Sequence, residues 1–287
     1  MSTPRPITIL IAALGGEGGG VLTQWIVSAA AQAGFPVQST SIPGVAQRTG
    51  ATTYYIEILP VPSRELGGRR PVLALTPGVG DIDVAVASEL LEAGRTVANG
   101  FVTRERTHVI GSLSRFYAMD EKIAMGDGRF DQDKLTKIIK DNAKDTLLID
   151  MDALARQSGS IINAVMLGAI AGCGRLPLKR EQYEAAVRDD GKSVDSNLRG
   201  FRAGYDAAHA KLQARTRRRK REEARTDTGV GRARSGTHLS CDRTGHRARG
   251  RAAPDPLSER SLCLALSQPP AADYRGRPTH GAHRASF

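Results

Sequence analysis

The first apolar segment of the chain is a continuous run of aliphatic residues, Ile7–Leu14. A run without alternating polar positions is typical of a strand that is buried on both faces of a parallel sheet. After a glycine-rich turn, apolar residues return at helical spacing in residues 21–33, and Gly34 provides a stop for that helix. Residues 37–41 then predict a second strand, so the chain begins with a strand–helix–strand unit.

Strand and helix patterns continue to alternate as far as residue 149. Further strands are predicted at 51–59, 83–87, 107–113 and 146–149, and helices at 89–98 and 131–142. Beyond residue 149 the pattern is helical, with predicted helices at 160–171, 179–188 and 194–213. Alternating strands and helices predict an α/β domain in which helices cover the faces of one sheet.

The positive charge of the chain is concentrated in its last quarter. Residues 1–214 hold 24 Lys and Arg against 23 Asp and Glu, whereas residues 215–287 hold 17 against 7. The second segment has 16 Arg but one Lys, and its apolar periodicity is lost, so we expect a disordered basic tail over residues 214–287. Three interpretations stay open: the product of a frameshifted or truncated gene, a basic arm that binds nucleic acid or an acidic partner, and a solvated extension without function. For the domain itself, nucleic acid is not an expected partner.

The first 214 residues have the features of a cytoplasmic domain. Residues 1–6 are polar, and the apolar run that follows stops at glycines instead of a cleavage site, so no secretory signal is predicted. The apolar stretch at 161–171 is too short to span a bilayer. Cys173 is the single cysteine before the tail, which is typical of a reducing compartment.

The glycine-rich loop GGEGGG lies between a predicted strand and a predicted helix, where backbone N–H groups can hold a phosphate. The candidate ligand-binding residues there are Gly15, Gly16, Gly18, Gly19 and Gly20. As a dinucleotide fingerprint the loop fails, because Val21 stands where a third glycine or alanine is expected. In addition, no acidic residue occurs between Glu17 and Glu57 to hold a ribose. Three interpretations stay open: a tight turn that only glycine permits, a contact with phosphate or coenzyme A, and NAD or FAD binding.

Several kinds of chemistry lack their usual residues in the domain. An iron–sulfur cluster needs about four thiolates and a structural zinc site about four ligands, whereas the domain has one cysteine, which we expect to be a small buried residue. His108 lies in a predicted strand and is expected to be a packed residue. No Gly-x-Ser-x-Gly motif is present. We therefore expect no catalytic residue, metal site or cofactor bound by this chain alone.

A second candidate site is the polar loop SIPGVAQRTG, residues 41–50, which connects two predicted strands. Ligands of open α/β sheets bind beyond strand ends, where this loop is expected to lie. Arg48 could bind a carboxylate or a phosphate with two parallel hydrogen bonds. We therefore expect Gln47, Arg48, Thr49 and Gly50 to contact substrate or a partner, although a solvated or structural arginine is the alternative.

Three motifs carry a resemblance to a known family. They are LGGEGGGVLT at Leu14–Thr23, QSTSIPGVAQRTGATTYYIE at Gln38–Glu57 and NAVMLG at Asn163–Gly168. Together they resemble the gamma-type domain of 2-oxoacid:ferredoxin oxidoreductases and, within that family, the beta subunits of indolepyruvate ferredoxin oxidoreductases. The resemblance covers residues 5–213. It implies a Rossmann-like α/β fold with a mostly parallel sheet and helices on both faces.

The resemblance also implies partners and cofactors. The domain would work with a larger subunit that carries thiamine diphosphate and 4Fe–4S clusters, and the complex would convert arylpyruvates to acyl-CoA while reducing ferredoxin. One residue departs from the family pattern, because Glu17 stands where a glutamine is usual, and a carboxylate there would repel a phosphate of CoA unless it points away. The alternative function is a stand-alone nucleotide- or CoA-binding module without redox activity.

Overall fold

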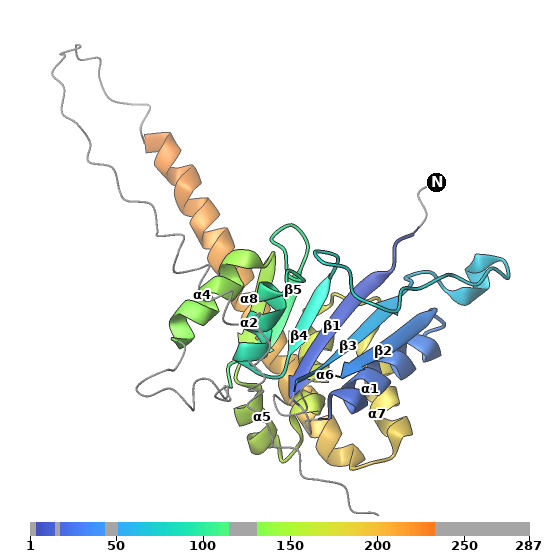
Figure 1. Ribbon diagram of the computed structural model, residues 1–287. Coiled ribbons are helices and arrows are strands. Elements are labelled where there is room, and N and C mark those ends of the chain that lie inside the picture. The colour runs from blue at the N-terminus through green and yellow to red at the C-terminus, as the bar shows by residue number, and fades with distance from the viewer. Residues whose placement is uncertain (1–3, 15–17, 44–50, 115–130, 233–287) are drawn as a thin grey trace, which may run out of the picture.

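The computed structural model describes residues 4–14, 18–43, 51–114 and 131–232. In this part of the chain six strands form one sheet with the order β2-β3-β1-β4-β5-β6 (Figure 1). β4, β5 and β6 continue parallel from β1, whereas β3 is antiparallel to both β1 and β2. The strands are β1 Ile7–Leu14, β2 Val37–Pro43, β3 Ala51–Ile58, β4 Val84–Ala87, β5 His108–Ser112 and β6 Asp145–Ile149.

The sheet is covered by helices on both faces. On one face Ile9, Ile11 and Ile56 pack in a core with residues from α1 Gly19–Gln32, α5 Met151–Ser158, α6 Ile162–Cys173, α7 Arg180–Asp190 and α8 Val194–Arg232. On the other face Leu10 and Val109 pack with residues from α2 Leu90–Ala98 and α4 Gln132–Asn142. Because β1 is buried on both faces, its sequence has no polar alternation. A short 3-10 helix, η1 Ser63–Leu66, lies in the connection between β3 and β4.

Helices α6 and α8 pack with their backbones in contact. A Cβ atom added to Gly168 of α6 would lie 2.8 Å from the Tyr205 backbone nitrogen and closer still to the Phe201 carbonyl oxygen. A Cβ on Gly172 would lie 2.8 Å from the Tyr205 carbonyl oxygen, and one on Gly204 of α8 would overlap the Val165 backbone. The absence of side chains at these glycines is therefore what allows the two helices to approach so closely.

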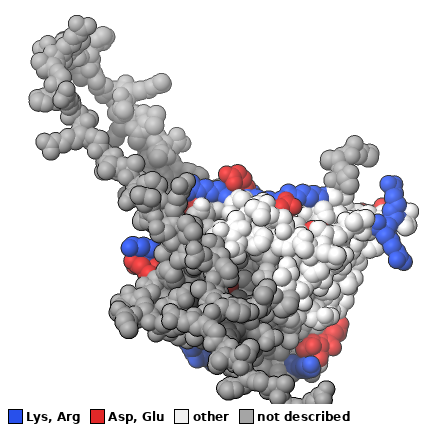
Figure 2. Space-filling view, viewed as in Figure 1, with Lys and Arg blue, Asp and Glu red and all other residues white. Residues whose placement is uncertain are grey.

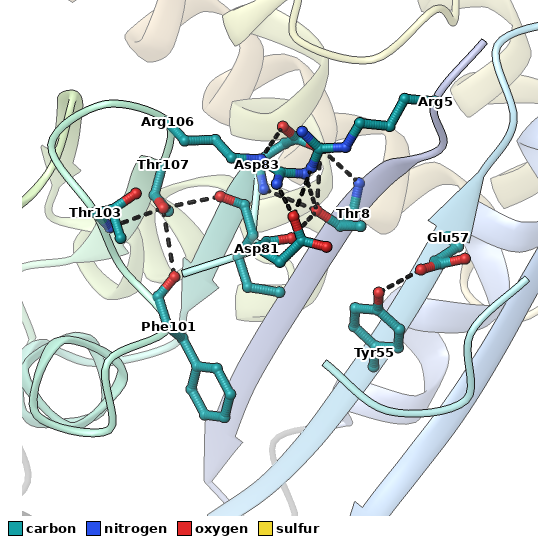
Figure 3. A network of polar contacts seen from close by, with 11 residues as sticks. Arg5, Thr8, Tyr55, Glu57, Asp81, Asp83, Phe101, Thr103, Arg106 and Thr107 are labelled. Atoms are coloured by element: carbon teal, nitrogen blue, oxygen red, sulfur yellow. Dashed lines mark hydrogen bonds and ion pairs between the residues drawn. The ribbon is translucent and has the colours of Figure 1, made fainter. Parts of the chain in front are cut away.

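An ion network joins the amino ends of β1, β4 and β5 (Figure 3). The Asp83 carboxylate accepts hydrogen bonds from the Thr8 backbone N–H at 2.9 Å and from Arg106 Nε at 2.8 Å. Arg106 and Arg5 also pair with Asp81, whose side chain is more exposed. These bonds connect the segments that precede three neighbouring strands, so the network holds the amino edge of the sheet together.

The predicted α/β fold, with a mostly parallel sheet and helices on both faces, is confirmed. α5 was not predicted, and β3 lies between the two strands of the first strand–helix–strand unit. The prediction that helical structure ends at Gln213 was wrong, because α8 continues to Arg232 and Arg215 pairs with Asp145 of β6. Arg, Lys, Glu and Ala are strong helix formers, so this helix continues where apolar periodicity has ended. The expected disorder of residues 233–287 lies outside the described residues.

Candidate functional site

The inner parallel strands end together at one edge of the sheet, here called the carboxyl edge. β1 ends at Leu14, β4 at Ala87 and β5 at Ser112. Ligands of open α/β sheets bind outside this kind of edge. The described residues that follow these strands are therefore the first candidates for a site.

Gly18 and Gly19 form the turn that starts α1 at this edge. Gly18 is the N-cap with φ 74° and ψ 29°, a left-handed conformation that favours glycine. A Cβ on Gly18 would overlap the Asn163 side-chain amide of α6, and one on Gly19 would lie 2.6 Å from the Tyr54 ring. At Gly20 the nearest such atom is the Tyr54 hydroxyl, at 3.7 Å. Tight packing thus accounts for Gly18 and Gly19, but not for Gly20.

The first turn of α1 has two features that suit an anionic ligand. Gly18 makes no side-chain cap hydrogen bond, and helix α1 has no acidic residue in its first turn. Backbone N–H groups at a helix start carry partial positive charge and need acceptors. Gly20 is exposed, so its backbone can be approached closely. This geometry fits the phosphate or CoA interpretation of the loop; Gly15, Gly16 and Glu17 lie outside the described residues.

Serine hydroxyls fasten the strand ends at the carboxyl edge. Ser88 Oγ accepts a hydrogen bond from the Leu14 N–H at 3.2 Å, and Ser112 Oγ accepts one from the Met151 N–H at 3.3 Å. Ser114 Oγ donates to Ser112 Oγ at 2.7 Å. These bonds connect β1 to β4 and β5 to α5, so the three serines hold the edge in shape.

Glu89 is a buried carboxyl group at this edge that the sequence predictions did not single out. It is the N-cap residue of α2, two residues beyond the end of β4, and is 1% exposed. A buried carboxylate needs polar partners, and the N-terminus of a helix favours its negative charge. The signal in the sequence was an acidic residue just beyond the apolar run of β4, at the first position of the helix predicted over residues 89–98.

The second predicted site, Gln47, Arg48, Thr49 and Gly50, lies outside the described residues. The strands on either side of it are described, however, and they reach the carboxyl edge. Leu14, the last residue of β1, pairs with Ala51, the first residue of β3. The glycine-rich loop and the loop 44–50 are therefore attached to neighbouring strand ends. Joint action of the two loops stays a prediction.

His108 and Cys173 lie away from this edge. His108 begins β5 at the amino edge, and burial, followed by the nearby cations Arg175 and Lys144, lowers its pKa to about 4. Cys173 is the last residue of α6 and is partly buried; burial raises the pKa of its thiol to about 11. His108 is thus a neutral packed residue, as predicted, and Cys173 carries a weakly acidic thiol.

The described residues show neither a metal-type cluster of side chains nor a membrane-spanning helix. No three His, Cys, Asp or Glu side chains in this part of the chain are grouped so that they could hold a metal ion. Within the same residues, none of the helices combines the length and apolar character that crossing a membrane requires.

The chain is similar to known proteins over most of its length. The profile of the family described as "Pyruvate ferredoxin/flavodoxin oxidoreductase" matches residues 8–207. Indolepyruvate oxidoreductase subunit IorB of Archaeoglobus fulgidus is 26% identical over 70% of this chain and 95% of its own length. The same subunit of Methanothermobacter thermautotrophicus is 28% identical over 70% of this chain and 96% of its own length.

The fold also occurs among solved structures. The 2-oxoglutarate:ferredoxin oxidoreductase of Magnetococcus marinus, with 2-oxoglutarate, coenzyme A and succinyl-CoA bound, superposes with a TM-score of 0.52 at 19% identity. The superposition covers 72% of this chain and 32% of that one. Since the family profile spans nearly all of the α/β domain, the chain belongs to the pyruvate ferredoxin/flavodoxin oxidoreductase family.

Proposed function

We propose that this chain is the smaller subunit of a cytoplasmic 2-oxoacid:ferredoxin oxidoreductase that acts on indolepyruvate and other arylpyruvates. One observation carries the proposal: the α/β domain corresponds to nearly the whole length of IorB subunits, 95% in one relative and 98% in another. The complex decarboxylates the 2-oxoacid oxidatively, transfers the acyl group to CoA and passes electrons to ferredoxin.

The residues of the domain support a division of labour between two subunits. Cys173 is the single cysteine of residues 1–214, and burial raises the pKa of its thiol, whereas cluster ligands are thiolates. We therefore assign thiamine diphosphate and the 4Fe–4S clusters to the larger subunit. Those cofactors supply the carbanion and electron-transfer chemistry.

The part of this chain in the reaction is at the carboxyl edge. The first turn of α1, with Gly18, Gly19 and Gly20, has backbone N–H groups that fit a phosphate of CoA. Arg48 and its neighbours Gln47, Thr49 and Gly50 would bind substrate or the larger subunit from the adjacent loop. Glu17 is compatible with this assignment only when its carboxylate points away from the phosphate.

The test is reconstitution under anaerobic conditions. The isolated chain should be colourless and inactive, and coexpression with the larger subunit should yield a complex that reduces ferredoxin when both indolepyruvate and CoA are present. A stoichiometric cluster or flavin on the isolated chain, or failure to bind the larger subunit, would contradict the proposal. The second result would favour a stand-alone CoA- or nucleotide-binding module.

Arg48→Ala separates a site role from a structural one. A surface substitution usually changes stability by no more than about 0.5 kcal/mol, so the thermal midpoint should stay nearly constant while turnover or complex formation falls. If the variant unfolds instead, the arginine belongs to the framework of the domain.

A further inference from the structure

The segment between η1 and β4, residues 67–80, presents apolar side chains to solvent. Val72 is 97% exposed, Val79 77% and Leu75 61%, and these are the three most exposed large apolar residues among those the structure describes. Large apolar side chains gathered on one surface segment mark a site of protein association. We call residues 67–80 the strap.

The strap is held in place by two side chains of the sheet, Glu57 and Thr40. The Ala74 N–H donates to Glu57 Oε2 at 2.7 Å, and Thr40 Oγ1 donates to the Leu75 carbonyl oxygen at 2.6 Å. Glu57 is itself 6% exposed and accepts a second hydrogen bond, from the Tyr55 hydroxyl at 2.5 Å (Figure 3). A buried carboxylate thus fixes the backbone of a segment whose own apolar side chains point to solvent. A segment ordered in advance loses less conformational entropy on binding.

The strap occupies the place that helices take elsewhere on the sheet. Thr40 pairs with Tyr55 across β2 and β3, and Tyr55 packs in the same core as α2 and α4. Bonds from Thr40 and Glu57 therefore place the strap on that face, over the two strands farthest from α4. Its outer side has no described element over it at Val72 or Val79.

The charge beside the strap indicates what it binds. Arg64, Arg69 and Arg70 precede the apolar residues, with Glu65 as the one acidic residue between positions 60 and 80. Figure 2 shows basic side chains projecting where Figure 1 places η1, next to uncharged surface. Two copies of this chain joined strap to strap would bring like charges together, which is destabilising. An apolar surface with an acidic rim would complement both features.

We propose that the strap is a docking surface for the larger subunit of the same oxidoreductase, which presents an apolar patch with acidic residues around it. The inference rests on the proposed function, because that function supplies the partner. It goes further by assigning the contact to residues 67–80, away from the loops of the carboxyl edge.

The experiment measures the dissociation constant between this chain and the purified larger subunit. Val72→Ser/Leu75→Ser/Val79→Ser should weaken binding about tenfold or more, since a few buried apolar anchors dominate an interface. The thermal midpoint of the free chain should stay unchanged, because these side chains are exposed. As a matched pair, Val79→Ser should weaken binding, whereas Ile161→Ser, which alters a 47% exposed residue at the start of α6, should not.

Charge gives a second, independent measurement. Arg69→Glu/Arg70→Glu should weaken binding most at low salt, because screening reduces the wild-type attraction as salt rises. Arg202→Glu, on the exposed side of α8, is the control.

Three results would overturn the inference. If wild type binds the larger subunit and the triple variant binds equally well, the strap is not the interface, and the proposed function stands. If the isolated chain dimerises and the triple variant abolishes the dimer, the strap binds a second copy instead. If wild type does not bind the larger subunit, the proposed function fails, and this inference fails with it.

Discussion

The close packing of α6 against α8 allows a sharp test with one added methyl group. In Gly168→Ala the new Cβ atom would lie 2.8 Å from the Tyr205 nitrogen, whereas ordinary contacts begin at 3.4 Å. The 2.8 Å contact alone would require the helices to separate by about 0.6 Å, and the Phe201 carbonyl oxygen, which lies closer still, would require more, because the obstacle is backbone that cannot change rotamer. A gap of about 0.5–1 Å forfeits a quarter to a half of the dispersion energy of the contacts it opens.

The two energetic effects of Gly168→Ala oppose each other. Alanine favours the helical state by up to about 1 kcal/mol over glycine. Overpacking a core costs about 1–3 kcal/mol and occasionally more, and here every residue of α6 from Asn163 to Ile170 is buried. We expect the steric cost to win, lowering the free energy of unfolding by about 2 kcal/mol and the thermal midpoint by about 4–8 °C for a domain of this size.

Urea and thermal unfolding followed by circular dichroism would measure this change. Gly20→Ala is the matched control, because its Cβ meets no non-helical atom closer than 3.7 Å, and it should leave stability unchanged or slightly raised. Gly172→Ala, with contacts of 2.8 and 2.9 Å, should fall between the two and serves if Gly168→Ala does not fold. A Gly168→Ala protein as stable as wild type would refute the close contact of the two helices.

Three further predictions concern other parts of the domain. Burial and neighbouring cations lower the pKa of His108 to about 4, so as the pH falls the unfolded chain binds a proton at this histidine before the folded chain does. The free energy of unfolding should therefore fall as the pH drops from about 6.5 to about 4. His108→Gln should flatten that part of the stability profile measured by denaturation. Asp83→Asn should lower the free energy of unfolding in urea by about 1–3 kcal/mol, because it weakens hydrogen bonds to two strands. Asp81→Asn, at a 55% exposed side chain, should lower it less. An equal loss of stability in the two variants would contradict the role of Asp83. Trypsin should cut beyond Arg232, where the sequence predicts disorder, and spare the domain, and a protease-resistant segment over residues 233–287 would contradict that prediction.

The sequence predicted those elements whose pattern of apolar residues or glycines reflects how they are packed in the fold. β1 was recognised because both of its faces are covered, which removes polar alternation, and the turn at Gly18 and Gly19 because close packing requires glycine. The position of β3 between β1 and β2 was not predictable in this way, since strand order depends on contacts between distant segments. α5 was missed although its ends are marked: Asp150 caps its start and Gly159, with φ 60°, its end.

The candidate site was predicted in part. The sequence identified both loops, and the structure shows that the strands carrying them end side by side. It did not identify Glu89, because a carboxylate at a helix start is usually a solvated cap and only the fold reveals its burial. The strap was missed for a related reason. Valine and leucine are usually buried, so nothing in the sequence indicated that Val72 and Leu75 are exposed, and only the fold shows it.

Helix α8 is a single long helix that runs from one edge of the sheet to the other. It begins at Val194, near the residues of α1 that follow the glycine loop, and passes the start of β6, where Arg215 pairs with Asp145. Ser196 lies in the first turn of α8 and Lys220 lies near its other end. At a rise of about 1.5 Å per residue, these two residues are about 36 Å apart along the helix axis. Spectroscopic probes at these two positions would lie near opposite edges of the sheet, so their relative response would report which edge an incoming protein approaches.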